Sequence, residues 1–227
     1  MLVLVRRRLF LILFVALVGC SKPEPQPVVR ETAPVRAQEP SVPDTRKVLV
    51  VLGDSISAGY GLDAGLSFPA VMQRTLDKEK LPWRVVNQGI SGDTTAGGAA
   101  RIDGALALKP SVVLLELGGN DGLRGLPLTS TRENLEKMIV SFQGSGAQVV
   151  LAGMTLPPNW GPDYIGGFEK IFKDLAVKHK AKLIPFLLSD MITQDLRYFQ
   201  SDGIHPTAPG AEIVAGTVLT AIRPMLQ

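Results

Sequence analysis

The sequence predicts an α/β domain in which a parallel sheet carries helices on both faces. The first observation is a set of short, continuous apolar runs, 47–52, 111–115 and 147–151, which are typical of strands covered on both sides. The second is that longer segments with helical spacing lie between these runs. Such alternation over about 180 residues favours a parallel sheet with right-handed crossovers. Reactive groups are then expected at the carboxyl ends of the strands.

Two shorter runs, 83–87 and 182–186, are further candidate strands. Two segments carry apolar residues at positions i, i+3, i+4 and i+7, which predicts helices: Leu135, Met138, Ile139 and Phe142 in one, and Phe168, Ile171, Phe172 and Leu175 in the other. Ser130 and Glu133 have the spacing of a capping box, which predicts that the first of these helices begins there.

The amino-terminal segment has the pattern of an export signal. Three arginines, at positions 6–8, precede an apolar run, 9–18, that is too short to span a bilayer comfortably. The run leads into Leu-Val-Gly-Cys, which resembles the lipobox of bacterial lipoproteins and implies acylation of Cys20. The alternative is an ordinary signal peptide with an incidental cysteine, but small residues in an Ala-x-Ala pattern are missing. We therefore expect residues 1–19 to be a lipoprotein signal peptide.

Residues 20–45 are expected to be a tether that follows the lipidated cysteine. This segment is rich in proline and has almost no bulky apolar residues beyond valine, so it cannot bury enough surface to offset its ordering entropy. Several acyl chains on Cys20 would hold the protein stably at a membrane surface. Residues 46–227 are then one globular domain on the periplasmic side of a bacterial membrane, and Ser21 weakly favours the outer membrane.

Composition excludes several classes of function. Without the three arginines of the signal segment, the 24 basic residues become 21 and equal the 21 acidic ones, so no electrostatic case for nucleic-acid binding remains. Cys20 is the one cysteine, which leaves the globular part without a disulfide, a cysteine-based zinc site or a thiol nucleophile. We expect no metal and no cofactor.

Ser55 lies just past the carboxyl end of the first predicted strand, in the run Gly-Asp-Ser that starts at Gly53. A turn into a helix there would expose its hydroxyl and its backbone N–H, as a nucleophile or an anion site requires. Gly-Asp-Ser also suits a plain turn or a loop that cradles a phosphate, and the loop alone does not decide between these interpretations. It is not a Walker loop, because no Gly-Lys-Ser/Thr follows, and it is not the Gly-x-Ser-x-Gly elbow, because position 57 is serine.

His205 is the candidate base for such a nucleophile. It follows Asp202 by three residues in a polar loop before the last predicted helix. An activated serine needs a base, and the base needs a carboxylate that fixes its tautomer. The other histidine, His179, is better explained as a cation at a helix carboxyl terminus. By itself, however, a loop histidine is more often solvated or capping.

Two further loops after strands carry candidate donors for an oxyanion. Asn120, in Gly-Gly-Asn-Asp-Gly, offers an amide donor that stays neutral, and Gly92, in Ser-Gly-Asp-Thr, offers a backbone N–H. Each is a weak signal alone, because both sequences also form turns. Their position after neighbouring strands is what favours a common site.

In order along the chain, residues 53–55, Gly92, residues 118–121 and residues 202–206 resemble the four blocks of the SGNH (GDSL) hydrolase family. The resemblance extends from about Lys47 to Leu226. The longer runs 116–125 and 202–206 resemble the branch of periplasmic acyl-CoA thioesterase I, lysophospholipase L1 and bacterial arylesterases.

The resemblance implies a three-layer α/β/α, flavodoxin-like fold and a serine esterase or thioesterase. It implies Ser55 as nucleophile, Asp202 and His205 as its triad partners, and an oxyanion hole formed by the Ser55 N–H, the Gly92 N–H and the Asn120 side chain. The expected partner is a small ester or thioester, such as an aryl ester, an acyl thioester or a lysophospholipid.

Residues 154–161 resemble the acyl-pocket segment of this branch, and we expect Leu156, Pro157 and Asn159 to bind substrate; the apolar side chains of Leu156 and Trp160 suit an acyl chain. An ordinary proline-containing connection is the alternative for this segment. Two other functions also remain open: an O-acetylesterase of envelope glycans, and a non-catalytic binding lipoprotein that keeps the fold.

Overall fold

Five parallel strands form the centre of residues 44–227, the part of the chain that the computed structural model describes. The strands are β1 (Lys47–Gly53), β2 (Trp83–Gly89), β3 (Val112–Glu116), β4 (Gln148–Ala152) and β5 (Lys182–Ile184). Their order in the sheet is β2-β1-β3-β4-β5, which is the flavodoxin-like order. The predicted signal peptide, Cys20 and nearly all of the predicted tether lie outside the described residues.

All five strands predicted from apolar runs are confirmed, with small differences at their ends. The last run was expected to reach position 186, but β5 ends at Ile184 because Pro185 lacks the N–H that a continuing ladder needs.

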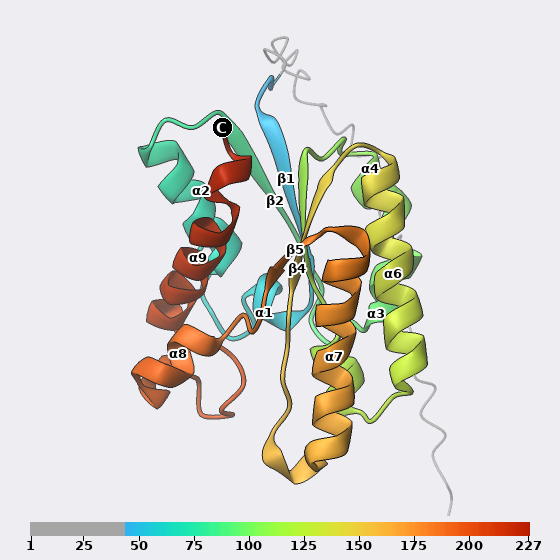
Figure 1. Cartoon of the computed structure of the whole chain (residues 1–227). Coiled ribbons are helices and arrows are strands. Elements are labelled where there is room, and N and C mark those ends of the chain that lie inside the picture. The colour runs from blue at the N-terminus through green and yellow to red at the C-terminus, as the bar shows by residue number, and fades with distance from the viewer. Residues whose placement is uncertain (1–43) are drawn as a thin grey trace, which may run out of the picture. The chain divides into compact units, whose positions relative to one another are not determined.

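The helices cover both faces of the sheet, which confirms the three-layer arrangement (Figure 1). Helices α2 (Phe68–Lys78) and α9 (Ala208–Ile222) cover one face, and α3 (Thr95–Ala100), α4 (Ile102–Leu106), α6 (Leu128–Gly144) and α7 (Pro162–His179) cover the other. The short elements α1 (Ser55–Ala58), α5 (Gly119–Leu123), α8 (Ser189–Gln194) and the 3-10 turns η1 (Pro158–Trp160), η2 (Leu196–Tyr198) and η3 (Arg223–Met225) complete the described chain.

The two helices expected from periodicity are α6 and α7, and both exist. The predicted start of α6 was wrong. The helix begins at Leu128, two residues before Ser130, after Pro127 at the cap position, and no side chain caps it. Thr131 explains the earlier start: it is fully buried, and its hydroxyl faces the Asp121 carboxylate at 3.4 Å, so the first turn is held from inside the fold.

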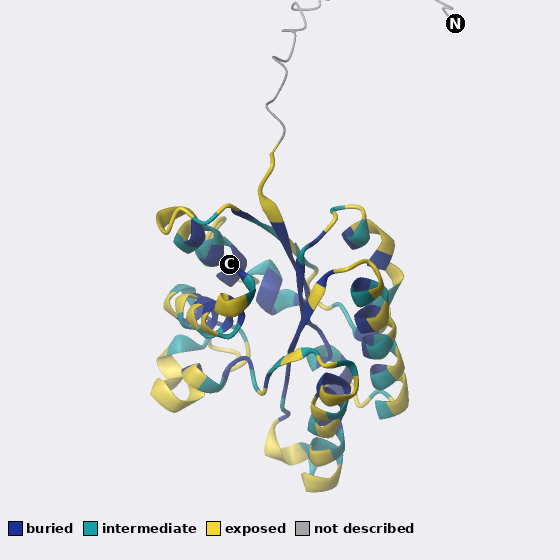
Figure 2. Ribbon diagram, turned by 45° about the horizontal axis from the view of Figure 1, so that its top comes forward, coloured by how far each residue is buried: buried dark blue, intermediate teal, exposed yellow. Residues whose placement is uncertain are grey.

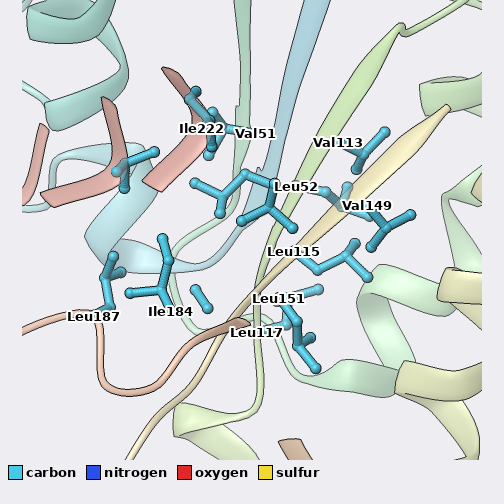
Figure 3. Packing of buried hydrophobic residues seen from close by; sticks show 14 of the residues in the cluster. Val51, Leu52, Val113, Leu115, Leu117, Val149, Leu151, Ile184, Leu187 and Ile222 are labelled. Carbon is cyan, nitrogen blue, oxygen red and sulfur yellow. The ribbon is translucent and has the colours of Figure 1, made fainter. Parts of the chain in front are cut away.

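The apolar strands form the middle of the core. In Figure 2 the sheet is buried along most of its length, while the outer faces of the helices are exposed. Figure 3 shows side chains of three neighbouring strands in this cluster, among them Leu52, Leu115 and Leu151. Burying each such side chain contributes about 1.5–3 kcal/mol. The central strands therefore form a rigid base for the loops at their carboxyl ends.

Within residues 44–227, no helix has both the length and the apolar character needed to cross a bilayer.

Candidate active site

Three adjacent strands end at one edge of the sheet, and each is followed by a predicted site residue. Ser55 follows β1, Gly92 follows β2 and Asn120 follows β3. Gly53, the last residue of β1, is aligned with Gly89 of β2 and with Glu116 of β3. The strand order reverses at this point, which is where open α/β sheets place their ligands.

Ser55 is held by a tight turn from β1 into α1. The Asp54 side chain caps α1 by accepting a hydrogen bond of 3.0 Å from the Ile56 N–H. Gly53 leaves room for the turn, because a Cβ there would lie 2.1 Å from the Ser57 hydroxyl. The turn therefore fixes Ser55 at the first position of the helix, as the sequence predicted.

His205 lies between Ser55 and Asp202, although it is 150 residues away from Ser55 in the chain. Its Nε2 is 2.8 Å from the Ser55 Oγ, and its Nδ1 is 2.7 Å from the Asp202 Oδ2. Backbone contacts fix the loop: the Gln200 N–H donates to the His205 carbonyl at 2.7 Å. The structure thus brings together the three side chains that the sequence singled out.

Asp202 is held in its ionised state. Its Oδ1 accepts the backbone N–H groups of Ile204 and His205, at 2.9 and 3.0 Å. Burial opposes ionisation, but the hydrogen bonds from the His205 side chain and from these two N–H groups outweigh it and lower the pKa of Asp202 to about 2. The carboxylate is therefore available to His205 at any pH well above 2.

Gly92 and Asn120 face Ser55 in the same cavity. Gly92 has φ +81°, which favours glycine. The Asn120 Nδ2 donates to the Asp54 Oδ2 at 3.1 Å and to the Asp93 carbonyl at 2.9 Å. Within residues 44–227, the N–H groups of Ser55 and Gly92 donate to no other atom. N–H donors from the segments after three different strands therefore line the same cavity as Ser55.

The loops that carry these donors are tied to one another by two residues that sequence analysis did not single out. The Arg101 guanidinium donates to the carbonyls of Gln88 and Gly53, at 2.6 and 2.9 Å, and forms an ion pair with Asp93 at 2.8 Å. Tyr60 stacks on His205 with ring centroids 4.6 Å apart. Arg101 lies between α3 and α4, and Tyr60 lies just after α1; the sequence around each gave no local signal of these contacts.

Asp121, which belongs to the Gly-Gly-Asn-Asp-Gly run, has a structural role. It is buried, and its carboxylate accepts the backbone N–H of Thr95 at 2.8 Å and the Thr95 hydroxyl at 2.5 Å. This contact joins the loop after β3 to the start of α3.

Two neighbouring cavities meet at the site. The first, of about 250 Å³, contains Ser55, His205, Gly92 and Asn120. The second, of about 310 Å³, is mostly apolar. The residues common to both are Ile56, Gly119, Leu123 and Ile204. An acyl group bound at Ser55 would therefore continue directly into apolar surroundings.

The predicted substrate-binding residues are divided between positions inside and outside this second cavity. Leu156 and Pro157 line it. Asn159 lies on the exposed turn η1 and does not line either cavity, and Trp160 packs instead against Tyr164 at a centroid distance of 5.5 Å. Sequence analysis did not single out two further residues of this cavity, Ile192 of α8 and Leu196 of η2.

Residues 44–227 contain no group of three or more His, Cys, Asp or Glu side chains placed to hold a metal ion. The arrangement at Ser55 combines a serine hydroxyl, a histidine in contact with a carboxylate, and nearby N–H donors. Such an arrangement suits acyl transfer.

Residues 51–213 match the model of the GDSL-like lipase/acylhydrolase family. The chain belongs to this family. The chain is 42% identical over 181 residues to the esterase TesA of Pseudomonas aeruginosa, covering 79% of this chain and 90% of that protein. It is 42% identical over 159 residues to an arylesterase of Vibrio mimicus, covering 70% and 79%. It is 35% identical over 179 residues to thioesterase 1/protease 1/lysophospholipase L1 of Escherichia coli, covering 78% and 84%.

A crystal structure of TesA has the same fold, with a TM-score of 0.75 at 42% identity over 79% of this chain and 99% of that one. The family and the fold that the sequence predicted are both confirmed. The protein is a carboxylic ester hydrolase.

The pKa of Asp202 provides a test of the site in solution. We expect its carboxyl carbon, followed by NMR, to titrate with a midpoint of about 2. His205→Ala should raise this midpoint, because it removes a hydrogen bond to the charged form. Since the folded pKa is depressed, Asp202 stabilises the fold above its unfolded pKa of about 3.9 and loses this effect as the pH falls through about 2. A wild-type midpoint near the ordinary value would contradict the geometry.

Proposed function

We propose that Ser55, His205 and Asp202 are the catalytic triad of this ester hydrolase and that it works through an acyl-enzyme. One observation carries the proposal: the continuous line of contacts from the Ser55 hydroxyl through both nitrogens of His205 to the Asp202 carboxylate. Distances of 2.8 and 2.7 Å are within the range required for proton transfer and for orientation of the base.

In the first half of the reaction, His205 takes the Ser55 proton on Nε2 while Oγ attacks the carbonyl carbon of the ester. Asp202 holds the Nδ1 proton and stabilises the imidazolium. The tetrahedral intermediate collapses, His205 gives the proton to the leaving alcohol or thiol, and the acyl group stays on Ser55. In the second half, water attacks the acyl-enzyme with His205 again as base, and the acid leaves.

The oxyanion would be bound by the N–H groups of Ser55 and Gly92 and by the Asn120 amide. The two backbone donors are free of other partners within residues 44–227, which supports this role. The Asn120 amide nitrogen already uses both of its N–H groups, donating to the Asp54 Oδ2 and to the Asp93 carbonyl. These contacts hold the amide beside Ser55, and one of them is released when the amide binds the oxyanion. The two backbone donors need no such rearrangement, and donors of that kind lower a barrier most.

The substrates we favour are esters or thioesters with an apolar acyl group, such as aryl esters, acyl thioesters and lysophospholipids. The apolar cavity beside Ser55 supports this choice, as do the relatives named arylesterase and thioesterase/lysophospholipase. An O-acetylesterase of envelope glycans is less well supported, because an acetyl group would leave the cavity of about 310 Å³ unused.

We also propose that the chain is a lipoprotein, anchored through acylated Cys20 on the periplasmic side of a bacterial membrane and joined to its catalytic domain by residues 20–45. The Leu-Val-Gly-Cys sequence and the proline-rich segment after it support this proposal. An enzyme placed there would meet lipid esters at the membrane surface.

The triad is tested by two variants assayed with a p-nitrophenyl ester. Ser55→Ala should lose essentially all turnover. Asn120→Ala should lower kcat by about 10²–10³, because one oxyanion donor is removed. Both should keep the circular dichroism spectrum of the wild type. Turnover by Ser55→Ala close to that of the wild type would refute the proposed nucleophile.

The acyl cavity is tested by Ile192→Asp. Ile192 lines the cavity and is half exposed, so the variant can fold while placing a charge beside the acyl chain. We expect kcat/KM for an octanoyl ester to fall by about tenfold or more, and that for an acetyl ester to change much less. Val140→Asp is the matched control, because Val140 is equally exposed on α6 but lies outside the cavity. Equal losses on both esters would argue against this acyl site.

The anchor is tested by expressing the full chain in a bacterium supplied with an alkyne-labelled fatty acid. The wild type should carry the label and sediment with membranes, and Cys20→Ser should lose the label and become soluble after cell breakage. Ser55→Ala with Cys20 intact is the control, because it excludes a label held as an acyl-enzyme. A labelled Cys20→Ser protein would contradict lipidation at this cysteine.

A further inference from the structure

Glu116 is a buried acid directly beneath the nucleophile turn. It is the last residue of β3, and its side chain is fully buried. One carboxyl oxygen, Oε2, accepts three hydrogen bonds from the loop after β1: the Asp54 N–H at 3.2 Å, the Ser57 N–H at 3.2 Å and the Ser57 hydroxyl at 2.5 Å. A single side chain of β3 therefore holds both ends of the turn that carries Ser55.

The other oxygen of Glu116, Oε1, is buried and receives no hydrogen bond from the described chain. An ionised carboxylate in this place would have half of its charge without a donor, at a high desolvation cost. Asp54 lies next to it, and two such close carboxyls do not both ionise readily. Burial and the neighbouring charge of Asp54 raise the pKa of Glu116 well above its usual value.

Asp54 connects Glu116 to the oxyanion side of the site. Burial raises the pKa of Asp54, while hydrogen bonds with the Ile56 N–H and with the Glu116 side chain lower it. The backbone N–H of Asp54 also donates to the Glu116 Oε2 at 3.2 Å, so the two residues are joined directly. Asp54 in turn accepts the Asn120 amide at 3.1 Å. The neighbouring charged groups are Arg101, which binds the Gly53 carbonyl, and His205, whose charge acts on Asp54.

We propose that Glu116 is a positioning residue whose uncharged carboxyl group holds the nucleophile turn and, through Asp54, the Asn120 amide in the geometry required for attack by Ser55. This proposal rests on the function proposed for Ser55. Glu116 does not line either cavity at the site, so it acts through the turn and not by touching substrate.

The test compares two replacements of Glu116 in the purified enzyme. Glu116→Gln is neutral and keeps both an acceptor and a donor, so kcat should stay within about tenfold of the wild type, the effect of one hydrogen bond. Glu116→Leu has a similar volume and no polar group, and a shift of the turn by about 1 Å should lower kcat about 10²-fold. KM should change little, because the acyl cavity is unaltered.

Leu114→Ala is the matched control for loss of stability. Leu114 is fully buried two positions earlier on β3 and lines neither cavity at the site. This variant should unfold at a lower temperature yet keep its kcat per folded molecule. Wild-type kcat in Glu116→Leu, or an equal loss in Glu116→Gln and Glu116→Leu, would overturn the proposal. Turnover by Ser55→Ala would refute the proposed nucleophile, on which the role of Glu116 rests, whereas either of these results with an inactive Ser55→Ala would overturn the role of Glu116 alone.

A second measurement covers the case in which Glu116→Leu does not fold. The unfolded chain releases this proton near pH 4.3, whereas the folded protein keeps it, so wild-type stability falls as the pH rises above that value. Glutamine has no such proton. The Tm of the wild type should therefore decline relative to that of Glu116→Gln between about pH 5 and 8. A Tm difference that is constant over this range would show that the proton is absent and would overturn the proposal.

Discussion

The parallel pairing of β1 with both β2 and β3 is the constraint on which the site depends. Gly53 is level with Gly89 on one side and with Glu116 on the other, so the three loops that follow begin at the same height of the sheet. A slip of one residue in either pairing would move a loop by about 3.3 Å and turn its side chains to the other face. The apolar residues 48–52 of β1 and 112–115 of β3 are buried on both faces of the sheet, which makes such a slip costly.

His205, the proposed base, comes from a more distant part of the chain, and other contacts fix its loop. An antiparallel bridge between Phe199 and Pro206 closes the loop, and Gln200 donates to the Tyr60 carbonyl at 2.7 Å. These contacts tie the segment before α9 to the segment after α1. The position of His205 is thereby fixed both by contacts within its own loop and by the contact of that loop with the segment after α1. The position of His205 relative to Ser55 is therefore fixed by these loop contacts as well as by the direct Ser55–His205 contact.

Most of the fold could be predicted from sequence because apolar runs and helical spacing are local signals. The residues of the proposed site could be predicted as well, since Ser55, Gly92 and Asn120 each follow a strand and His205 has an aspartate three residues before it. Their mutual distances could not, because those depend on strand order.

The features that sequence analysis did not predict correctly have the same physical origin. Ser130 has the local pattern of a cap, but the buried contact of Thr131 with Asp121 starts α6 earlier. Glu116 ends an apolar strand and gave no sign that its carboxyl would lie beneath the turn of Ser55. Seven of the fifteen residues that line the apolar cavity come from residues 186–204, a stretch in which sequence analysis predicted no helix. Tertiary contacts decided each of these features.

The central claim is that Ser55 is a nucleophile activated by His205. It is tested most directly by mass spectrometry of the protein after brief treatment with a fluorophosphonate. We predict one adduct, on the peptide that contains Ser55, and a much slower reaction in His205→Ala. An unmodified Ser55 in the folded wild-type protein, or an adduct on another residue that forms at the same rate without His205, would contradict the account.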